Sequence, residues 1–455
     1  MLKPPAFLAA LRPGNLRCLT GAALRPGNLW RSRPDSVRPP HPKLREGCRC
    51  LAGAALIIPL CVLSCRRPES PAASSRTIVV WEQDDASVAP FIDSVFESFR
   101  KLPENSGVTI IRSHYQNEDL RQQFQAASLA DIPPDLIMGP SDAAGVYAVS
   151  GFILPVNRLF NLGKYNKAVL EAITLDNSTW GIPVSNGNHL MFFYNKRLAP
   201  KVPENTAELF RYCGGKARDL GLSYCMAFDM GEPFWLMPWL GAFGGWPIDD
   251  KTPTLDTKAM RDALNFYLDL KYLKKFVPAE CDYNCMDALF KESRVAFIIN
   301  GDWAISTYAR QMGKDFGVAR IPRLSATGKW PAPMVSGKYF MLSSALKGEK
   351  LELVIRLVDF YTDRENQVAQ YRALRRLPAL TEAMKASEIT SDPVSRASIS
   401  QLMKGRPMPM ATEIRAVWDS IRPHMGRAVT RKVSVEEAVT KMQIDAVSKI
   451  KEMNQ

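Results

Sequence analysis

Short apolar runs alternate with longer segments of helical periodicity through the body of the chain. The run at 78–81 is typical of a buried strand, and apolar residues then recur at helical spacing over 91–102. Two further strands are predicted at 108–111 and 135–138, with a helix at 119–129 between them. This βαβαβ order indicates α/β architecture.

The same alternation continues toward the end of the chain. Apolar runs predict later strands, and amphipathic patterns predict later helices: strands at 190–194, 296–300 and 338–343, helices at 351–362 and 435–453. Ser434, followed by Glu437 three residues on, has the spacing of a capping box and marks the start of the last helix. No repeat of short period occurs, so a solenoid is not expected.

Carboxylates follow two of the predicted parallel strands. Asp85 comes after the first strand and Asp142 after the third. In open α/β sheets, ligands bind beyond the carboxyl ends of the strands. We therefore expect Asp85 and Asp142 to face a common cleft.

Length and charge narrow the possible classes of function. A chain of 455 residues is longer than a single hydrophobic core usually supports, and its length predicts about two or three domains. Of the net charge of +13, residues 1–65 carry +8, from ten basic and two acidic residues, and the remainder carries +5. Since the body has no basic run interleaved with aromatic residues and no nucleic-acid motif, we expect no nucleic-acid partner.

The nine cysteines fall into two groups. Five precede residue 66, and the body holds Cys213, Cys225, Cys281 and Cys285. No histidine of the body lies near a cysteine, and no phosphate-binding loop occurs, so neither a metal site nor another cofactor is expected. In an exported chain these four cysteines allow two disulfides in three possible pairings; unpaired thiols are the alternative.

The N-terminal region has the pattern of a targeting sequence rather than of a folded domain. Residues 1–50 are rich in Pro and Arg, show no helical or strand period, and are interpreted as unstructured or as an over-extended start. Residues 51–65 resemble a lipoprotein signal that ends in Val-Leu-Ser-Cys, which implies lipidation of Cys65. The alternative is an ordinary cleaved signal with an incidental cysteine. Residues 66–76 are expected to form a polar tether.

Several ordered blocks resemble one family: IVVWEQDD at 78–85, the stretch from PPDLIMGPSD to SGFILPV at 133–156, WGIPVSNGNHLMFFYNKRL at 180–198, EPFW at 232–235 and VAFIINGDWA at 295–304. By these blocks the chain is identified as a member of the family 1 extracellular solute-binding proteins of ABC transporters, nearest in pattern to maltose/maltodextrin-binding proteins. The resemblance implies a two-lobed α/β periplasmic-binding-protein fold, type II-like, with a hinge that the chain crosses more than once. It places 77–185 and 336–383 in one lobe, and 186–335 and 384–455 in the other.

The resemblance also implies a set of residues that bind a carbohydrate. Aromatic rings stack on the apolar faces of sugars, and carboxylates and amides bind their hydroxyls. The residues carried over are Asp85, Asp142, Glu232, Phe234, Trp303, Trp418 and Asn188. Four of them have a plainer interpretation: Asp142 as a helix cap, the two tryptophans as core, and Glu232 as a surface carboxylate.

The chain also departs from the maltodextrin pattern. Ala86 and Ala143 stand where that pattern has Lys and Arg, and Asn188 or a neighbour stands where it has Glu. We therefore expect an oligosaccharide other than maltose itself, bound by a monomer and handed to membrane permease subunits, with no catalysis. The alternatives are a secreted glycoside hydrolase and a binder of a non-sugar solute on the same fold.

Overall fold

The computed structural model describes residues 75–84 and 86–453. The predicted segments 1–50 and 51–65, with Cys65, lie outside the described residues, as do most of the tether and Asp85.

The first sheet has six strands in the order β14-β13-β3-β1-β2, with β6 also paired to β13. Its strand β1 is parallel to both β2 and β3, and β13 is antiparallel to β3. The strands are β1 Thr77–Glu82, β2 Thr109–His114, β3 Leu136–Gly139, β6 Ile182–Gly187, β13 Met334–Leu342 and β14 Arg406–Pro407. The βαβαβ order predicted from the apolar pattern is confirmed.

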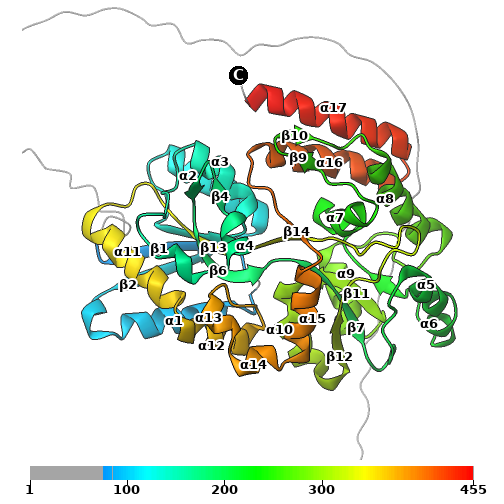
Figure 1. Cartoon of the computed structure of the whole chain (residues 1–455), viewed down its shortest axis with the longest axis horizontal. Helices are drawn as coiled ribbons and strands as arrows, with labels where there is room; N and C mark the ends of the chain where they lie inside the picture. Colours follow the sequence, from blue (N-terminus) through cyan, green and yellow to red (C-terminus); the bar gives the residue numbers. More distant parts are fainter. Residues whose placement is uncertain (1–74, 85, 454–455) are drawn as a thin grey trace, which may run out of the picture. The chain divides into compact units, whose positions relative to one another are not determined.

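Helices cover this sheet and bury their apolar stripes against it (Figure 1). They include α1 Ala89–Arg100, α2 Asn117–Leu129, α3 Ala144–Val149, α4 Lys167–Glu171, α11 Gly348–Tyr361, α12 Arg364–Leu374 and α13 Thr381–Met384. In α1, a proline in the first turn begins the helix, and Ile92, Val95, Phe96 and Phe99 form its buried face. This sheet with its helices is called the first lobe.

The second sheet has four strands in the order β12-β7-β11-β8. They are β7 Leu190–Asn195, β8 Met226–Ala227, β11 Phe297–Gly301 and β12 Phe316–Ala319. Its helices include α5 Thr206–Gly214, α6 Lys216–Asp219, α7 Pro233–Ala242, α8 Lys258–Leu268, α9 Tyr283–Lys291, α10 Ile305–Met312, α16 Glu413–Val429 and α17 Val435–Met453. Two disulfides lie here, Cys213–Cys225 and Cys281–Cys285. This sheet with its helices is called the second lobe.

The two lobes have separate hydrophobic cores, and the chain crosses between them several times. One core holds Val184 and the other Leu190, so the first crossing lies between β6 and β7. Strand β13 makes a second crossing, because Met334 belongs to one core and Tyr339 to the other. A third crossing follows α13: the chain passes α14 Ser387–Thr390 and reaches α15 Pro393–Leu402, which packs on β12 of the second lobe, before it continues through β14 to α16.

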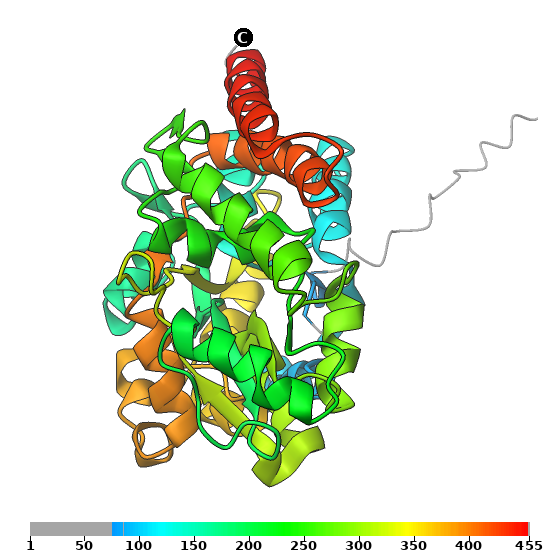
Figure 2. The same cartoon turned by 90° about the vertical axis from the view of Figure 1, so that its right-hand side faces the viewer.

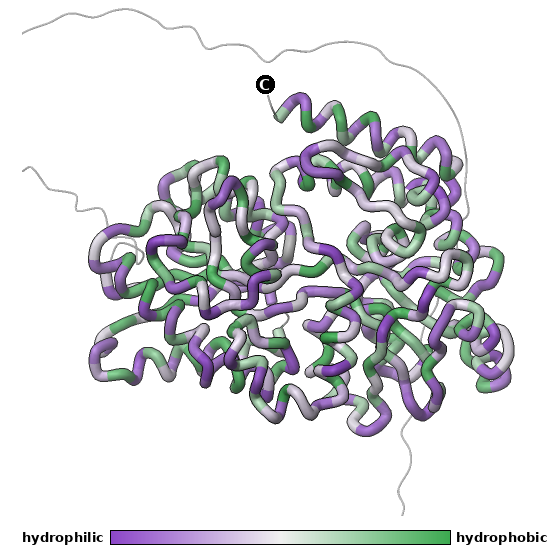
Figure 3. Tube along the Cα trace, in the orientation of Figure 1, coloured by the Kyte–Doolittle hydropathy of each residue, from purple (hydrophilic) through white to green (hydrophobic). Residues whose placement is uncertain are grey.

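The C-terminal helix α17 forms as the capping pattern predicts. The Ser434 hydroxyl accepts a hydrogen bond of 3.0 Å from the Glu437 backbone N–H at its start. Hydrophilic and hydrophobic residues alternate along it in Figure 3, and its buried side packs on α16, beside which it lies in Figure 2. Among the described residues, no helix is both long enough and apolar enough to span a membrane.

Candidate functional site

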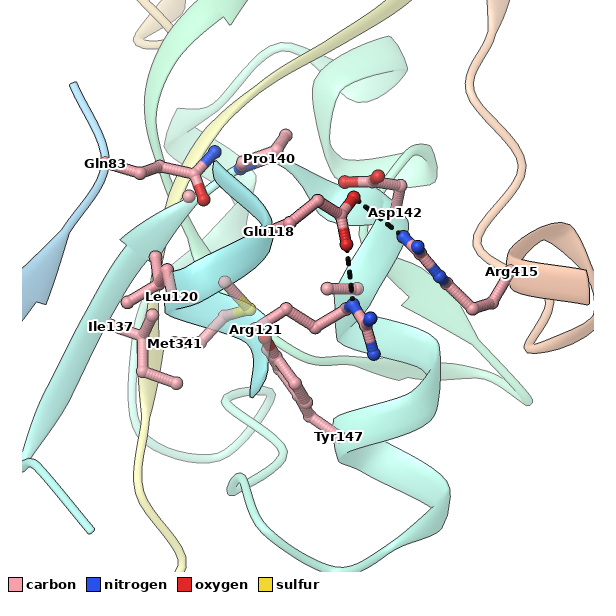
Figure 4. Close-up of a pocket in the computed structure, with 12 residues that line it drawn as sticks. Gln83, Glu118, Leu120, Arg121, Ile137, Pro140, Asp142, Tyr147, Met341 and Arg415 are labelled. Carbon is pink, nitrogen blue, oxygen red and sulfur yellow. Dashed lines mark hydrogen bonds and ion pairs between the residues drawn. The ribbon is translucent and has the colours of Figure 1, made fainter. Parts of the chain in front are cut away.

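Asp142 lies at the carboxyl end of β3, in the short turn Ser141–Ala143 that precedes α3. It is half-buried and borders a cavity of about 20 Å³, room for about one water molecule. The helix itself begins after Ala143, and no side-chain capping bond is present at its N-cap. Figure 4 shows Asp142 beside Arg415, which reaches this cavity from α16.

Arg415 joins the two lobes at this cavity. Its Nη1 donates to Glu118 Oε1 of α2 at 3.0 Å, and its Nη2 donates to Asp419 Oδ1 at 2.6 Å. Glu118 also accepts from Arg121 Nε at 3.2 Å (Figure 4). Burial raises the pKa of Asp142, and the neighbouring Arg415 charge opposes that rise. Carboxylates and guanidinium groups therefore meet at one interlobe point, where they can bind hydroxyl groups.

Glu232 lies at the N-cap of α7 in the second lobe. Its two carboxylate oxygens accept from Arg422 Nη2 at 3.1 and 3.0 Å. Burial raises the pKa of Glu232 above its ordinary value, and the charge of Arg422 offsets only part of that rise. The carboxylate is thus half-buried and paired with a cation rather than standing alone on the surface.

One face of α16 carries both arginines. Arg415, Trp418 and Arg422 follow one another at spacings of three and four residues, which places them on one side of the helix. Because seven residues of helix span about 10 Å, the Cα atoms of Arg415 and Arg422 lie about that far apart along the axis. Helix α16 therefore brings a carboxylate of each lobe to one surface.

An aromatic cluster lies beside Glu232. Phe234 and Trp235 lie in the first turn of α7, and their ring centroids lie 6.3 and 6.2 Å from that of Trp303. Trp303 is half-buried, and its indole N–H donates to the Tyr283 hydroxyl at 3.0 Å. A Cβ at Gly301 would collide with the Trp303 ring, so the glycine of the Asn-Gly-Asp-Trp block leaves room for that ring.

The remaining predicted residues lie at different depths. Trp418 is 5 % exposed and belongs to the core of the second lobe. Asn188 is half-buried in the turn between β6 and β7, with a φ of 43°, and its backbone N–H donates to Asp302 Oδ2 at 3.1 Å. Asp85 lies outside the described residues, so its predicted role remains a prediction.

The residue before Asp85 takes part in a buried ionic cluster that the sequence analysis did not identify. Asp84 is 4 % exposed, and its carboxylate accepts from Arg376 at 2.8 and 2.9 Å, with Lys338 at 3.5 Å. Burial raises the pKa of Asp84, but the Arg376 and Lys338 charges outweigh it and hold the pKa well below its usual range. The cluster ties the loop after β1 to β13 and to the segment after α12.

Sequence reasoning also did not select Arg415, Arg422 and Tyr283. The two arginines carry a usable signal, because they flank Trp418 at helical spacing in an amphipathic helix. Nothing in the local sequence marks their distant partners: Glu118 lies 297 residues from Arg415, and Glu232 lies 190 residues from Arg422. Among residues 75–84 and 86–453, no cluster of potential metal ligands occurs.

A model of the family described as bacterial extracellular solute-binding protein matches residues 95–397. The maltose/maltodextrin-binding domain of Bdellovibrio bacteriovorus, solved with maltotriose bound, is 32 % identical with a TM-score of 0.77, over 82 % of this chain and 100 % of that one.

Two relatives extend this comparison. The galactooligosaccharide-binding protein of Bacillus subtilis is 23 % identical over 87 % of this chain and 95 % of its own. A maltooligosaccharide ABC transporter solute-binding lipoprotein of Streptococcus pneumoniae is 27 % identical over 70 % and 76 %. The matched structure and the two relatives are all similar to this chain through most of its body.

Proposed function

Because the chain belongs to the bacterial extracellular solute-binding proteins and has their two-lobed fold, we propose that it captures an oligosaccharide between its lobes and presents it to an ABC importer. The sugar is a maltodextrin-like glucoside or a related short oligosaccharide. The relatives named for maltooligosaccharides and galactooligosaccharides support this class of ligand.

The observation that carries the proposal is the arrangement along α16. Its Arg415 meets Glu118 beside Asp142 of the first lobe, and its Arg422 meets Glu232 of the second lobe. The rings of Phe234 and Trp303 lie next to Glu232 in the same lobe. Charged groups for hydroxyls and rings for C–H faces are the two surfaces that a sugar requires.

The departures from the maltodextrin pattern shape the ligand preference. Ala86 and Ala143 carry no charge, and Arg415 of the other lobe lines the same cavity as Asp142. A positive charge therefore still lies near Asp142, but Arg415 of α16 supplies it. Its distance from Asp142 depends on how the two lobes are arranged. We propose that the preferred ligand is longer than maltose and extends toward Trp303.

Location and partners follow from the same assignment. We propose that the N-terminal signal is cleaved, that Cys65 is lipidated, and that the tether 66–76 holds a monomer near permease subunits at the outer face of the membrane. A relative named as a solute-binding lipoprotein supports this anchoring.

The test is a thermal-shift and calorimetric screen of the purified protein. Maltotriose, longer maltodextrins, galactosyl oligosaccharides, maltose and the polyamine spermidine form the panel. A true ligand raises the midpoint with concentration because it binds only the folded state. We expect an oligosaccharide of three or more units to give the largest shift; no response to any sugar, with a response to spermidine, would overturn the proposal.

The enzyme alternative is tested with the same oligosaccharides. The two candidate acids Asp142 and Glu232 belong to different lobes, and Glu232 is paired with Arg422. We propose that neither acid cleaves a glycosidic bond. Sustained release of reducing ends that is lost in Glu232→Gln or Asp142→Asn would contradict this.

A further inference from the structure

The two disulfides of the second lobe join different elements. Cys213–Cys225 joins the end of α5 to the strand region of β8, and both of its cysteines are buried. Cys281–Cys285 spans only four positions and encloses the first turn of α9, where Asp282 is the N-cap. The Asp282 carboxylate accepts from the Cys285 backbone N–H at 2.8 Å. The start of α9 is therefore held by both a cap and a covalent bond.

Tyr283, inside this disulfide loop, contacts the residues assigned to the cleft. Its hydroxyl accepts from the Trp303 indole N–H at 3.0 Å, and its ring packs edge-on against Trp235, with centroids 6.1 Å apart. The backbone N–H of Tyr283 also faces the Asp229 carboxylate and lowers its pKa, which opposes the rise that burial causes. Asp229 in turn accepts from the backbone N–H groups of Gly231 and Glu232, at 2.9 and 3.2 Å. One short loop thus touches both Trp303 and the turn that carries Glu232.

A disulfide that closes so short a loop removes little entropy from the unfolded chain, compared with one that closes a longer loop. Its main effect is local, because it limits the conformations of the residues it encloses. Gly301 also affects the position of Trp303. It leaves room for the Trp303 ring but does not fix the direction of the indole N–H. The hydrogen bond to Tyr283 supplies that direction.

We propose that the Cys281–Cys285 disulfide is a positioning element of the sugar site: it fixes Tyr283, which orients the Trp303 ring for stacking. The inference rests on the proposed function. Cys281, Cys285 and Tyr283 act through Trp303, and their loss lowers affinity while the fold stays intact.

The binding test compares three variants with wild type, using maltotriose in calorimetry. Cys281→Ser/Cys285→Ser frees the loop, Tyr283→Phe removes only the hydroxyl, and Cys213→Ser/Cys225→Ser removes the buried disulfide between the end of α5 and β8. We expect the first two to weaken affinity about three- to tenfold, a part of one aromatic contact. A fourth variant, which combines Cys281→Ser/Cys285→Ser with Tyr283→Phe, should bind maltotriose no more weakly than Cys281→Ser/Cys285→Ser alone. The third should lower the thermal midpoint and leave affinity within about twofold.

A readout without ligand separates this inference from the proposed function. In protein labelled with 5-fluorotryptophan, the Trp303 resonance, assigned with Trp303→Phe, should shift or broaden in Cys281→Ser/Cys285→Ser and in Tyr283→Phe, and stay unchanged in Cys213→Ser/Cys225→Ser. If wild type binds no sugar, the proposed function fails, and the resonance alone decides the inference. An unchanged Trp303 resonance, an unchanged maltotriose affinity, or equal effects from both disulfide variants would each overturn it.

Discussion

Arg415 of α16 donates a hydrogen bond of 3.0 Å to Glu118 of α2, and so holds the second lobe to the first at the edge of the cavity that contains Asp142. A second interlobe contact, between the hydroxyls of Thr307 and Ser87 at 3.1 Å, carries no charge. The ion pair is therefore the stronger of these two links.

Glu118→Gln should shift the lobes toward an open arrangement. Because Glu118 is about two-fifths exposed, solvent screens the pair, and we expect affinity for maltotriose to fall only about two- to fivefold. X-ray scattering should show a larger radius of gyration for the ligand-free variant. Arg121→Gln is the matched control, since Arg121 pairs with Glu118 inside the first lobe; an equal effect there would refute an interlobe role.

The interlobe pair should weaken in acid. Burial raises the pKa of Glu118, but Arg415 and Arg121 together outweigh it, so that the pKa lies below the ordinary value. Opening the lobes removes the Arg415 part of this lowering, so the pair favours the closed arrangement above the ordinary pKa of about 4.3 and loses that effect as pH falls through the lowered pKa. Scattering at stepwise lower pH should show opening in wild type; Glu118→Gln, which is already shifted toward the open arrangement at neutral pH, should lack the step.

Arg376→Met should destabilise the first lobe strongly. It leaves the buried Asp84 carboxylate without its main partner, and breaking such a pair costs about 3–5 kcal/mol. Chemical denaturation measures the loss in free energy of unfolding. Asp84→Leu/Arg376→Met, which removes both charges, should recover much of it; a double variant as unstable as the single one would contradict this account.

The same Asp84 carboxyl adds a pH dependence to unfolding. Its pKa is lowered, so its contribution is present above the unfolded pKa of about 3.9 and is lost as pH falls through the folded value. Between about pH 5 and pH 2, wild type should lose more stability than Asp84→Leu/Arg376→Met. Parallel curves for the two proteins would show that Asp84 is not the group responsible.

Trp303→Ala and Trp418→Ala test the predicted stacking rings. Losing one platform should cost about 1–3 kcal/mol of binding free energy, or roughly ten- to a hundredfold in affinity. Because Trp418 is buried, Trp418→Ala should also cost about 3–5 kcal/mol of stability, so Trp418→Phe is the gentler variant. If the folded variants of both residues keep full affinity by calorimetry, the assignment of these rings to the cleft is wrong.

Cys65→Ala tests the anchor, whose sequence lies outside the described residues. The variant should be released from membranes or remain unprocessed, because the acceptor thiol of the lipid is gone. Palmitate labelling in a bacterial host measures it, and deletion of residues 2–50 should leave the labelling intact. Undiminished labelling of Cys65→Ala would refute the prediction.

Elements with a strong local period were predictable from the chain alone. The strand at Ile78 to Trp81, the strand at Leu190 to Tyr194 and the capped helix α17 appear where their patterns indicate. Side-chain direction repeats every two residues in a strand and every 3.6 in a helix. Burial of one face therefore makes apolar residues recur in the sequence at that period. The ordered family blocks added the two-lobed fold.

Contacts between distant residues depended on the tertiary structure. The sequence allowed three pairings of four cysteines, and only the fold brings Cys213 to Cys225 and Cys281 to Cys285. Likewise, Asp84 and Arg376 stand 292 residues apart, and Glu118 and Arg415 stand 297 apart. The local sequence around a charged residue shows that the residue is polar, but it does not show which partner that residue contacts. The partner depends on how the two lobes and helix α16 pack together.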